Sequence, residues 1–127
     1  MGAGLAGCCA ALSAHEAGAS VLIVEKNSQP GGSSVRAAGT FAFSGTDLQR
    51  ESGIDDTPEA LTEELIALQG SAGKRHLVEV YVRDQQDTYE WLRRHCVVFE
   101  RVQLSGGQKV PRAHAVRTGE MIDTLWN

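Results

Sequence analysis

Three glycines near the start of the chain constrain its fold more than any other feature. They are Gly2, Gly4 and Gly7, and they match the pattern GxGxxG. In such a turn the first glycine allows a tight bend, the second lets a pyrophosphate approach the backbone, and the third lets a helix pack closely on a sheet. The phosphate then lies on the helix N-terminus, where free N–H groups and the dipole favour negative charge. The pattern alone leaves a purely structural turn as an equal alternative, because glycine-rich turns before helices are common.

The residues after the glycine turn predict a helix followed by a strand. Small residues from Leu5 onward favour a helix, with Gly18 as its C′ residue. Residues 20–25 form a β-branched run without polar alternation, which is typical of a parallel strand buried on both faces. Glu25 ends this run 21 residues after Gly4, close to the ~20 expected of an acidic residue that binds ribose hydroxyls. The alternative is a solvated charge at a strand end. An acidic residue here also argues against a cofactor with a 2′-phosphate.

Residues 27–46 are too rich in glycine for a helix, and they predict a loop that a ligand approaches closely. Paired glycines expose backbone N–H groups, and the serine and threonine hydroxyls add donors for phosphate or flavin oxygens. An ordinary flexible loop is the alternative. The glycine-rich segment comes directly after a predicted strand that ends in an acidic residue, and this order favours FAD over NAD as the cofactor. The predicted cofactor-binding residues are Gly2, Gly4, Leu5, Ala6, Glu25, Lys26, Gly32, Ser33, Ser34, Gly39 and Thr40.

The second half of the chain predicts mainly helices. Thr57 as N-cap and Pro58 at the first helical position begin one helix, which should end near Gly70. Apolar residues at steps of three and four predict a second helix from after Gly73 to about His95.

Shorter elements follow these two helices. Residues 97–99 and 102–104 predict short strands, residues 111–118 a basic irregular segment, and residues 121–126 the beginning of one more helix.

Composition excludes several classes of function. The net charge is −4 and the basic residues are scattered, so the chain lacks the basic stripe of a nucleic-acid-binding protein. Its longest apolar runs are far short of the ~20 residues that span a bilayer. Cys8, Cys9 and Cys96 are odd in number and have no metal-ligand spacing, which predicts buried thiols in a reducing compartment. We therefore expect a cytoplasmic protein without nucleic-acid partners.

The sequence predicts no catalytic residue and no metal ligand. A histidine near an arginine, as in His114 and Arg112, suggests acid–base catalysis or anion binding. A histidine in a basic loop is, however, more often solvated. We therefore expect both residues at the border of a substrate domain and outside the chemistry.

These segments together resemble the flavoprotein family of fumarate reductases, succinate dehydrogenases, L-aspartate oxidases and 3-ketosteroid dehydrogenases. The most specific similarity lies in Glu25-Lys26, residues 30–34 (PGGSS) and residues 37–40 (AAGT), which in that family contact the FAD phosphates and the flavin ring. A weaker similarity, to an R-x-H…TGG segment before the substrate cap, lies in residues 112–119. The resemblance implies an α/β fold, a Rossmann-like FAD-binding domain with added helices.

Compared with that family, the chain is expected to be an incomplete N-terminal fragment. Only Met1 precedes Gly2, where the family has its first strand, and Asn127 comes before the family's substrate-binding arginine. We expect a partial FAD-binding domain over residues 1–110 and the start of the substrate-cap segment over residues 111–127. The chain alone is then expected to bind FAD weakly and to show no turnover, because the substrate is bound mainly by parts outside it.

Three hypotheses follow for function. The first is an FAD oxidoreductase that passes hydride between flavin and a C–C bond next to a carbonyl or carboxylate. The second is a module that holds NAD or ADP without flavin chemistry. The third is a non-catalytic gene fragment that self-associates through the exposed edge of its 21–24 strand.

Overall fold

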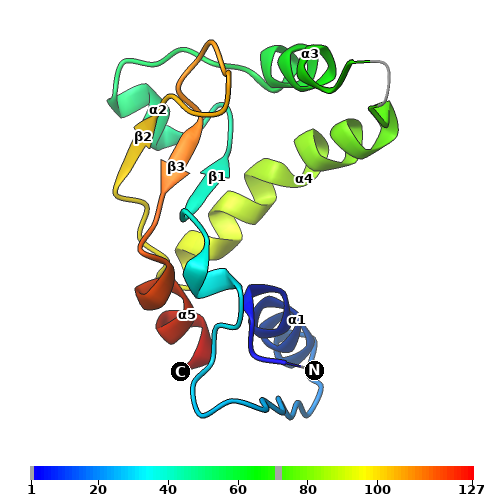
Figure 1. Ribbon diagram of the computed structural model, residues 1–127, viewed down its shortest axis with the longest axis vertical. Helices are drawn as coiled ribbons and strands as arrows, with labels where there is room; N and C mark the ends of the chain where they lie inside the picture. Colours follow the sequence, from blue (N-terminus) through cyan, green and yellow to red (C-terminus); the bar gives the residue numbers. More distant parts are fainter. Residues whose placement is uncertain (1, 71–72) are drawn as a thin grey trace. The chain divides into compact units, whose positions relative to one another are not determined.

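The described residues form helices and short strands (Figure 1). The computed structural model describes residues 2–70 and 73–127, so Met1 lies outside the described residues. The chain divides into a first unit, Met1–Gly39 with His95–Val98 and Val116–Asn127, and a second unit, Thr40–Arg94 with Phe99–Ala115. The elements are α1 (Leu5–Glu16), η1 (Ser34–Arg36), β1 (Thr40–Ala42), α2 (Asp47–Glu51), α3 (Pro58–Gln69), α4 (Arg75–Arg94), β2 (Arg101–Gln103), β3 (Ala113–Ala115) and α5 (Thr118–Trp126).

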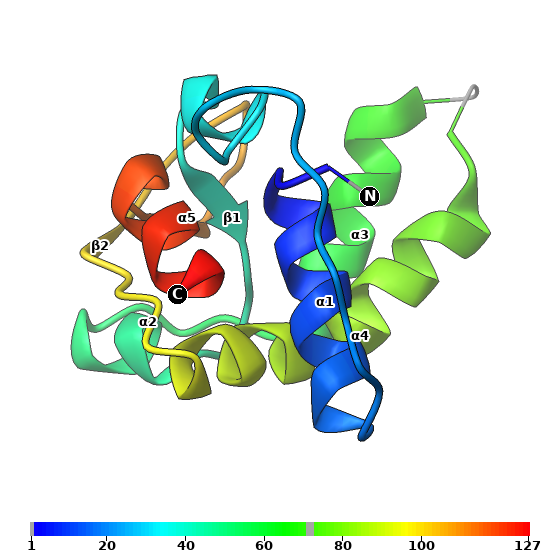
Figure 2. The ribbon, with the colours of Figure 1, turned by 90° about the horizontal axis from the view of Figure 1, so that it is seen from below.

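The first unit is built on contact between α1 and α5, which Figure 2 shows from below. Both helices lie where the sequence predicts them. The side chains that α1 buries are small, whereas those of α5 are larger and apolar, so the two faces complement each other. The buried residues are Gly7, Cys8 and Ala11 in α1 and Met121, Ile122 and Leu125 in α5.

The predicted strand over residues 20–25 is wrong, because no part of this run is a strand. Leu22 is 82% exposed and Val24 64% exposed. A strand is stabilised by the backbone of its neighbours, and no described strand pairs with this run. Its β-branched composition therefore gives neither a hydrogen-bonded ladder nor burial.

The second unit holds a three-stranded antiparallel sheet in the order β1-β3-β2. His114 on the central strand pairs with Phe41 on one side and with Val102 on the other. The mixture of helices and strands agrees with the predicted fold class in part, while the parallel sheet of a Rossmann fold is not among the described strands. The predicted irregular segment at residues 111–118 is wrong, since it contains the central strand β3, all three of whose residues are buried.

The predictions for the other short strands were right for one and wrong for the other. Residues 97–99 form no strand, and β2 at Arg101–Gln103 lies one residue before the predicted 102–104. Hydrogen bonds to the central strand decide which short segment becomes a strand.

The two long helices of the second unit confirm the capping signals. Thr57 accepts a hydrogen bond from the Ala60 N–H at 3.2 Å, Pro58 is the first residue of α3, and Gly70 is its C-cap with a φ of 59°. The helix α4 ends at Arg94, one residue before the predicted end. Leu61 of α3 packs with two buried valines of α4, Val78 and Val82.

The three thiols differ in their burial. Cys8 is buried, Cys9 is half-buried and Cys96 is exposed, so the prediction of buried thiols is wrong for Cys96. All three are free. Within residues 2–70 and 73–127, no helix is both long and apolar enough to cross a bilayer.

The first unit depends on a glycine at position 39. Gly39 has a φ of +70°, and an added Cβ would lie 2.4 Å from the Val116 carbonyl oxygen. We expect Gly39→Ala to lower the free energy of unfolding by about 1–2 kcal/mol for the left-handed backbone and by roughly 1–3 kcal/mol more for the clash. Gly18→Ala is the matched control, because Gly18 has a φ of +84° with nothing within 4 Å of its added Cβ. Urea unfolding of both variants measures the difference, and equal losses would show that the contact with Val116 contributes nothing.

Candidate functional site

The predicted phosphate position lies at the start of α1 in the first unit. Gly4 caps this helix without a side-chain hydrogen bond. The helical ladder begins with the Cys8 N–H, which donates to the Gly4 carbonyl at 3.0 Å. The N–H groups of Leu5, Ala6 and Gly7 therefore have no acceptor within the helix. Leu5 N–H donates to Ser34 Oγ at 3.1 Å, and the N-terminal end of a helix is where an anion is favoured.

The second glycine segment is joined to the first by its backbone. Gly31 N–H donates to the Ala3 carbonyl at 2.6 Å, and Gly4 and Gly31 form an isolated parallel bridge. Gly31 is buried with a φ of +113°, and an added Cβ would lie 2.3 Å from Val35 Cγ1. The glycine turn, residues 2–7, and the second glycine segment, residues 31–39, which we call the serine segment, are therefore brought together.

The sequence prediction assigned the second glycine of this pair and missed the first. Gly32 is exposed, and nothing lies within 4 Å of its added Cβ. The paired glycines after Pro30 carried the signal, but only the backbone shows that Gly31 makes the close contact.

Both carboxylate oxygens of Glu25 accept backbone hydrogen bonds, and one of these comes from the glycine turn. Oε2 accepts from the Ala3 N–H at 2.9 Å, and Oε1 accepts from the Asn27 N–H at 2.9 Å. The hydrogen bonds from Asn27 and then Ala3 lower the pKa of Glu25, so the carboxylate is ionised at neutral pH. A carboxylate has about four lone-pair sites, so two remain for hydroxyl donors. The predicted ribose acceptor thus lies beside the predicted phosphate turn, and an added Cβ at Gly2 would be 3.4 Å from its Oε2.

Two predicted residues make their contacts with other segments, and a third is exposed. Gly39 contacts the residues before α5, where the Val116 N–H donates to its carbonyl at 2.8 Å. Thr40 belongs to the second unit, where it pairs with Ala115 as the first residue of β1. Lys26 is exposed.

Arg112, expected at the border of a substrate domain, is buried in the second unit with 1% of its surface exposed. Its Nε and Nη2 donate to the two carboxylate oxygens of Asp56 at 2.7 and 2.6 Å, and its Nη1 lies 2.9 Å from Glu64 Oε2. Burial by itself lowers the pKa of Arg112, but the hydrogen bonds with Asp56 and Glu64 outweigh it and raise that pKa overall. The sequence alone does not show that two distant carboxylates converge on this residue.

His114 is fully buried as well, which corrects the expectation that this histidine is solvated. Its Nδ1 lies 2.7 Å from the Arg112 carbonyl and its Nε2 lies 2.8 Å from Thr46 Oγ1. A carbonyl only accepts, so Nδ1 carries the proton, and the Thr46 hydroxyl donates to Nε2 while accepting from the Gln49 N–H at 3.1 Å. This network fits the neutral imidazole, and burial lowers the pKa of His114.

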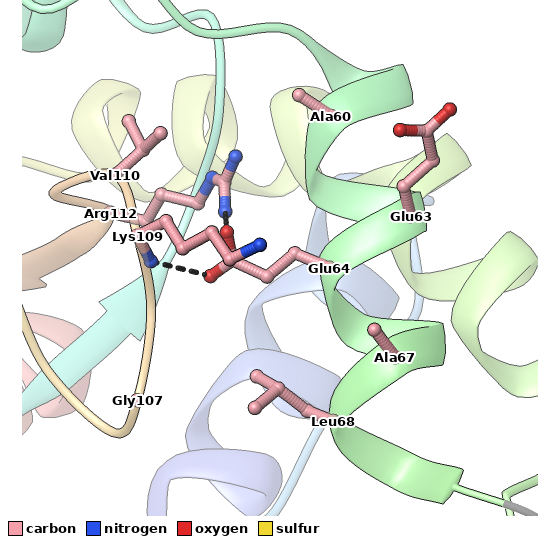
Figure 3. A pocket seen from close by; sticks show the side chains of 9 residues that line it. All are labelled: Ala60, Glu63, Glu64, Ala67, Leu68, Gly107, Lys109, Val110 and Arg112. Carbon is pink, nitrogen blue, oxygen red and sulfur yellow. Dashed lines mark hydrogen bonds and ion pairs between the residues drawn. The ribbon is translucent and has the colours of Figure 1, made fainter.

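An open pocket of the second unit lies between α3 and the loop before β3 (Figure 3). Its volume is about 530 Å³. Glu64 points toward Arg112 and also accepts from the Lys109 N–H at 3.0 Å. The residues that line it are Ala60, Glu63, Glu64, Ala67, Leu68, Gly107, Lys109, Val110 and Arg112. None of them is a predicted cofactor contact. Among the described residues, no group of three or more His, Cys, Asp or Glu side chains could hold a metal ion.

Comparison with known proteins identifies the family. The chain matches the family model described as FAD binding domain over residues 1–123, and it belongs to that family. Its cofactor is therefore FAD, which argues against the alternative of a module that holds only NAD or ADP.

The similar proteins include several reductases. The chain is 32% identical over 122 residues to the NADH:fumarate oxidoreductase of Klebsiella pneumoniae, a match that covers 96% of this chain and 13% of that protein. It is 33% identical to a probable fumarate reductase of Shewanella frigidimarina, with 98% of this chain and 22% of that protein covered. The chain thus spans less than a quarter of the length of either relative.

Two solved structures have the same fold. The open conformation of a flavocytochrome c3 fumarate reductase has a TM-score of 0.88 at 32% identity, covering 98% of this chain and 23% of that one. The 3-ketosteroid-delta4-(5alpha)-dehydrogenase of Rhodococcus jostii RHA1, in complex with 4-androstene-3,17-dione, has a TM-score of 0.87 at 26% identity and covers 98% and 34%.

The groups in the first unit fit the chemistry of FAD. The N–H groups of Ala6 and Gly7 and the exposed hydroxyl of Ser33 are donors for a pyrophosphate, whereas the Glu25 carboxylate is an acceptor for ribose hydroxyls. The residues present therefore include donors of the kind that bind a pyrophosphate and an acceptor of the kind that binds ribose hydroxyls.

The buried ion pair of the second unit should contribute strongly to stability. Removal of one partner leaves a buried charge without compensation, so Asp56→Ala should cost about 3–5 kcal/mol. Glu120→Ala is the control, because Glu120 pairs with Arg117 on the surface, where both side chains are more than 60% exposed, and should cost no more than about 1 kcal/mol. Urea unfolding followed by circular dichroism gives both values, and similar small losses would contradict a stabilising role for the buried pair.

Burial of neutral His114 predicts a loss of stability in acid. The unfolded chain takes up a proton near pH ~6.5 while the folded histidine resists it, so stability falls as pH decreases below that value, by up to about 1.4 kcal/mol per pH unit. We expect His114→Gln to flatten the dependence of the unfolding free energy between pH 7.5 and 5.5, as measured by urea unfolding. His76→Gln alters an exposed histidine and should leave the slope unchanged. An unaltered slope in His114→Gln would place the acid sensitivity elsewhere.

Proposed function

We propose that this chain supplies the adenosine and pyrophosphate contacts of a flavin-dependent oxidoreductase of the fumarate reductase type. The observation that supports the proposal is the hydrogen bond between Glu25 and Ala3, because it brings a carboxylate suited to ribose hydroxyls next to the start of α1. In this view the first unit is the dinucleotide-binding portion of a Rossmann-like domain.

Each group then has one role toward the cofactor. The N–H groups of Ala6 and Gly7 bind the pyrophosphate, and the Ser33 hydroxyl adds a donor from the second segment. Glu25 accepts hydrogen bonds from the ribose hydroxyls, and Gly4 gives the phosphate room at the backbone. The contact of Gly31 with Ala3 keeps the two segments in register. The Thr40 hydroxyl and the Lys26 amine are further contacts that the family resemblance implies.

The reaction we propose is hydride transfer between flavin and a C–C bond next to a carbonyl or carboxylate. Bound FAD supplies that hydride chemistry, and the protein contributes binding and orientation. The similar proteins favour this reaction, since fumarate and 4-androstene-3,17-dione both carry a C=C bond beside such a group. We assign no catalytic residue within the chain, because Arg112 and His114 are held in a buried structural network.

The ribose contact gives a direct test. Glu25→Ala should weaken FAD binding by about 1–3 kcal/mol, because it removes a charged acceptor. Titration of FAD into the purified 127-residue chain, followed by the change in flavin fluorescence, measures both dissociation constants.

FMN and a surface variant serve as controls for this test. FMN lacks the adenosine ribose, so its binding should be the same in Glu25→Ala and in the unaltered chain. Glu120→Ala removes an exposed carboxylate from the same unit and should leave FAD affinity unchanged. Equal FAD affinities in the Glu25→Ala variant and the unaltered chain would remove Glu25 from the site and contradict the proposal.

A further inference from the structure

We propose that Thr118, the first residue of α5, is a positioning residue that holds the serine segment against the start of α1 for FAD binding. The inference rests on the proposed placement of the FAD pyrophosphate in the first unit. Thr118 lies 84 residues after Ser34 in the chain, so its role is visible only in the folded structure.

The hydroxyl of Thr118 satisfies a carbonyl that the serine segment leaves free. In η1 the Arg36 N–H donates to the Ser33 carbonyl and the Ala37 N–H donates to the Ser34 carbonyl. The next carbonyl, that of Val35, accepts from Thr118 Oγ1 at 3.1 Å. Thr118 therefore continues the hydrogen bonding of η1 at the point where its own backbone stops.

A second contact fixes the end of the same segment. Val116 lies two residues before Thr118, and its N–H donates to the Gly39 carbonyl at 2.8 Å. The Thr118 methyl group lies over the same glycine, 3.0 Å from where a Cβ would be. The residues around the start of α5 thus hold the segment at both Val35 and Gly39, and no side chain at position 39 would fit between them.

On the other side, the segment is bound to the predicted phosphate site. Ser34 Oγ accepts from the Leu5 N–H at 3.1 Å, and Ser34 directly precedes the residue whose carbonyl Thr118 binds. One turn of backbone therefore links α5 to the N-terminus of α1. Without the Thr118 hydroxyl, the Val35 carbonyl loses its partner, and the position of Ser33 and Ser34 must be ordered when FAD binds, at a cost in affinity.

The Thr118 hydroxyl donates a hydrogen bond to the serine segment and does not cap α5, the helix that contains it. Arg117 is the N-cap residue of α5, and no side chain caps that helix. Thr118→Val keeps the branched shape and the methyl group while removing the hydroxyl, so it leaves the backbone bonding of α5 unchanged. Thr118→Ser keeps the hydroxyl and is the conservative variant.

The experiment measures FAD dissociation constants by flavin fluorescence for the unaltered chain, Thr118→Val, Thr118→Ser, Ser34→Ala and the Thr118→Val/Ser34→Ala double variant. We expect Thr118→Val to weaken binding by roughly 3- to 10-fold, as for one lost hydrogen bond, and Thr118→Ser to restore most of it. Because both residues act on one turn, the double variant should be weakened by less than the product of the single effects.

Different outcomes separate the inference from the proposed function. If Ser34→Ala leaves FAD affinity unchanged, the proposed cofactor site is wrong and the inference is overturned with it. If Ser34→Ala weakens binding but Thr118→Val does not, the site stands and the positioning role of Thr118 is overturned. Equal losses in Thr118→Val and Thr118→Ser would also overturn it, since the hydroxyl would then have no role.

Folding is followed separately for each variant. Thermal unfolding by circular dichroism should show Thr118→Val and Thr118→Ser within a few degrees of the unaltered chain. If Thr118→Val fails to fold, Thr118→Ala is the second variant without a hydroxyl, and the same comparison with Thr118→Ser decides the outcome.

Discussion

Gly4 begins α1 without a side-chain cap, so the N–H groups at the start of that helix depend on acceptors from elsewhere in the chain. Ser34 provides one acceptor for Leu5, and Glu25 provides another for Ala3 just before the helix. These contacts bring together segments that lie 22 and 29 residues apart in sequence. The helix end at which they meet is also where an anion such as a pyrophosphate is favoured. The same local requirement thus explains both the structure of the first unit and its fit to FAD.

The second unit depends on a different constraint, the compensation of buried polar groups. Arg112 is buried because Asp56 and Glu64 bind its guanidinium group, and His114 is buried because Thr46 and the Arg112 carbonyl bind its ring. Both residues come from the short stretch that forms the centre of the sheet. A histidine and an arginine that suggested chemistry in the sequence are therefore explained by packing. Phe43 stacks edge-on against the His114 ring at a centroid distance of 5.4 Å, which completes its enclosure.

The elements that the sequence predicted correctly are those with strong local signals. Thr57 and Pro58 begin α3, Gly70 ends it, and the apolar periodicity of α4 marks its extent to within a residue. The strands were predicted less well, because three-residue strands are set by their partners. The sequence of β3, Ala-His-Ala, has no strand signal of its own, yet β3 lies between β1 and β2. The 21–24 run has a strong strand signal, but no described strand pairs with it.

For the candidate site, the sequence by itself determined the residue types: a glycine turn, an acidic residue about 20 positions later, and a serine-rich glycine segment. It determined the cofactor class as well, because those types in that order match an FAD binding domain. Only the tertiary structure decided that Gly31 rather than Gly32 contacts the turn, that Glu25 binds the backbone of Ala3, and that Thr118 binds the carbonyl of Val35. The physical reason is that spacing along a chain fixes which groups can be neighbours within one helix or turn, whereas hydrogen bonds between distant segments form only after the backbone has folded them together.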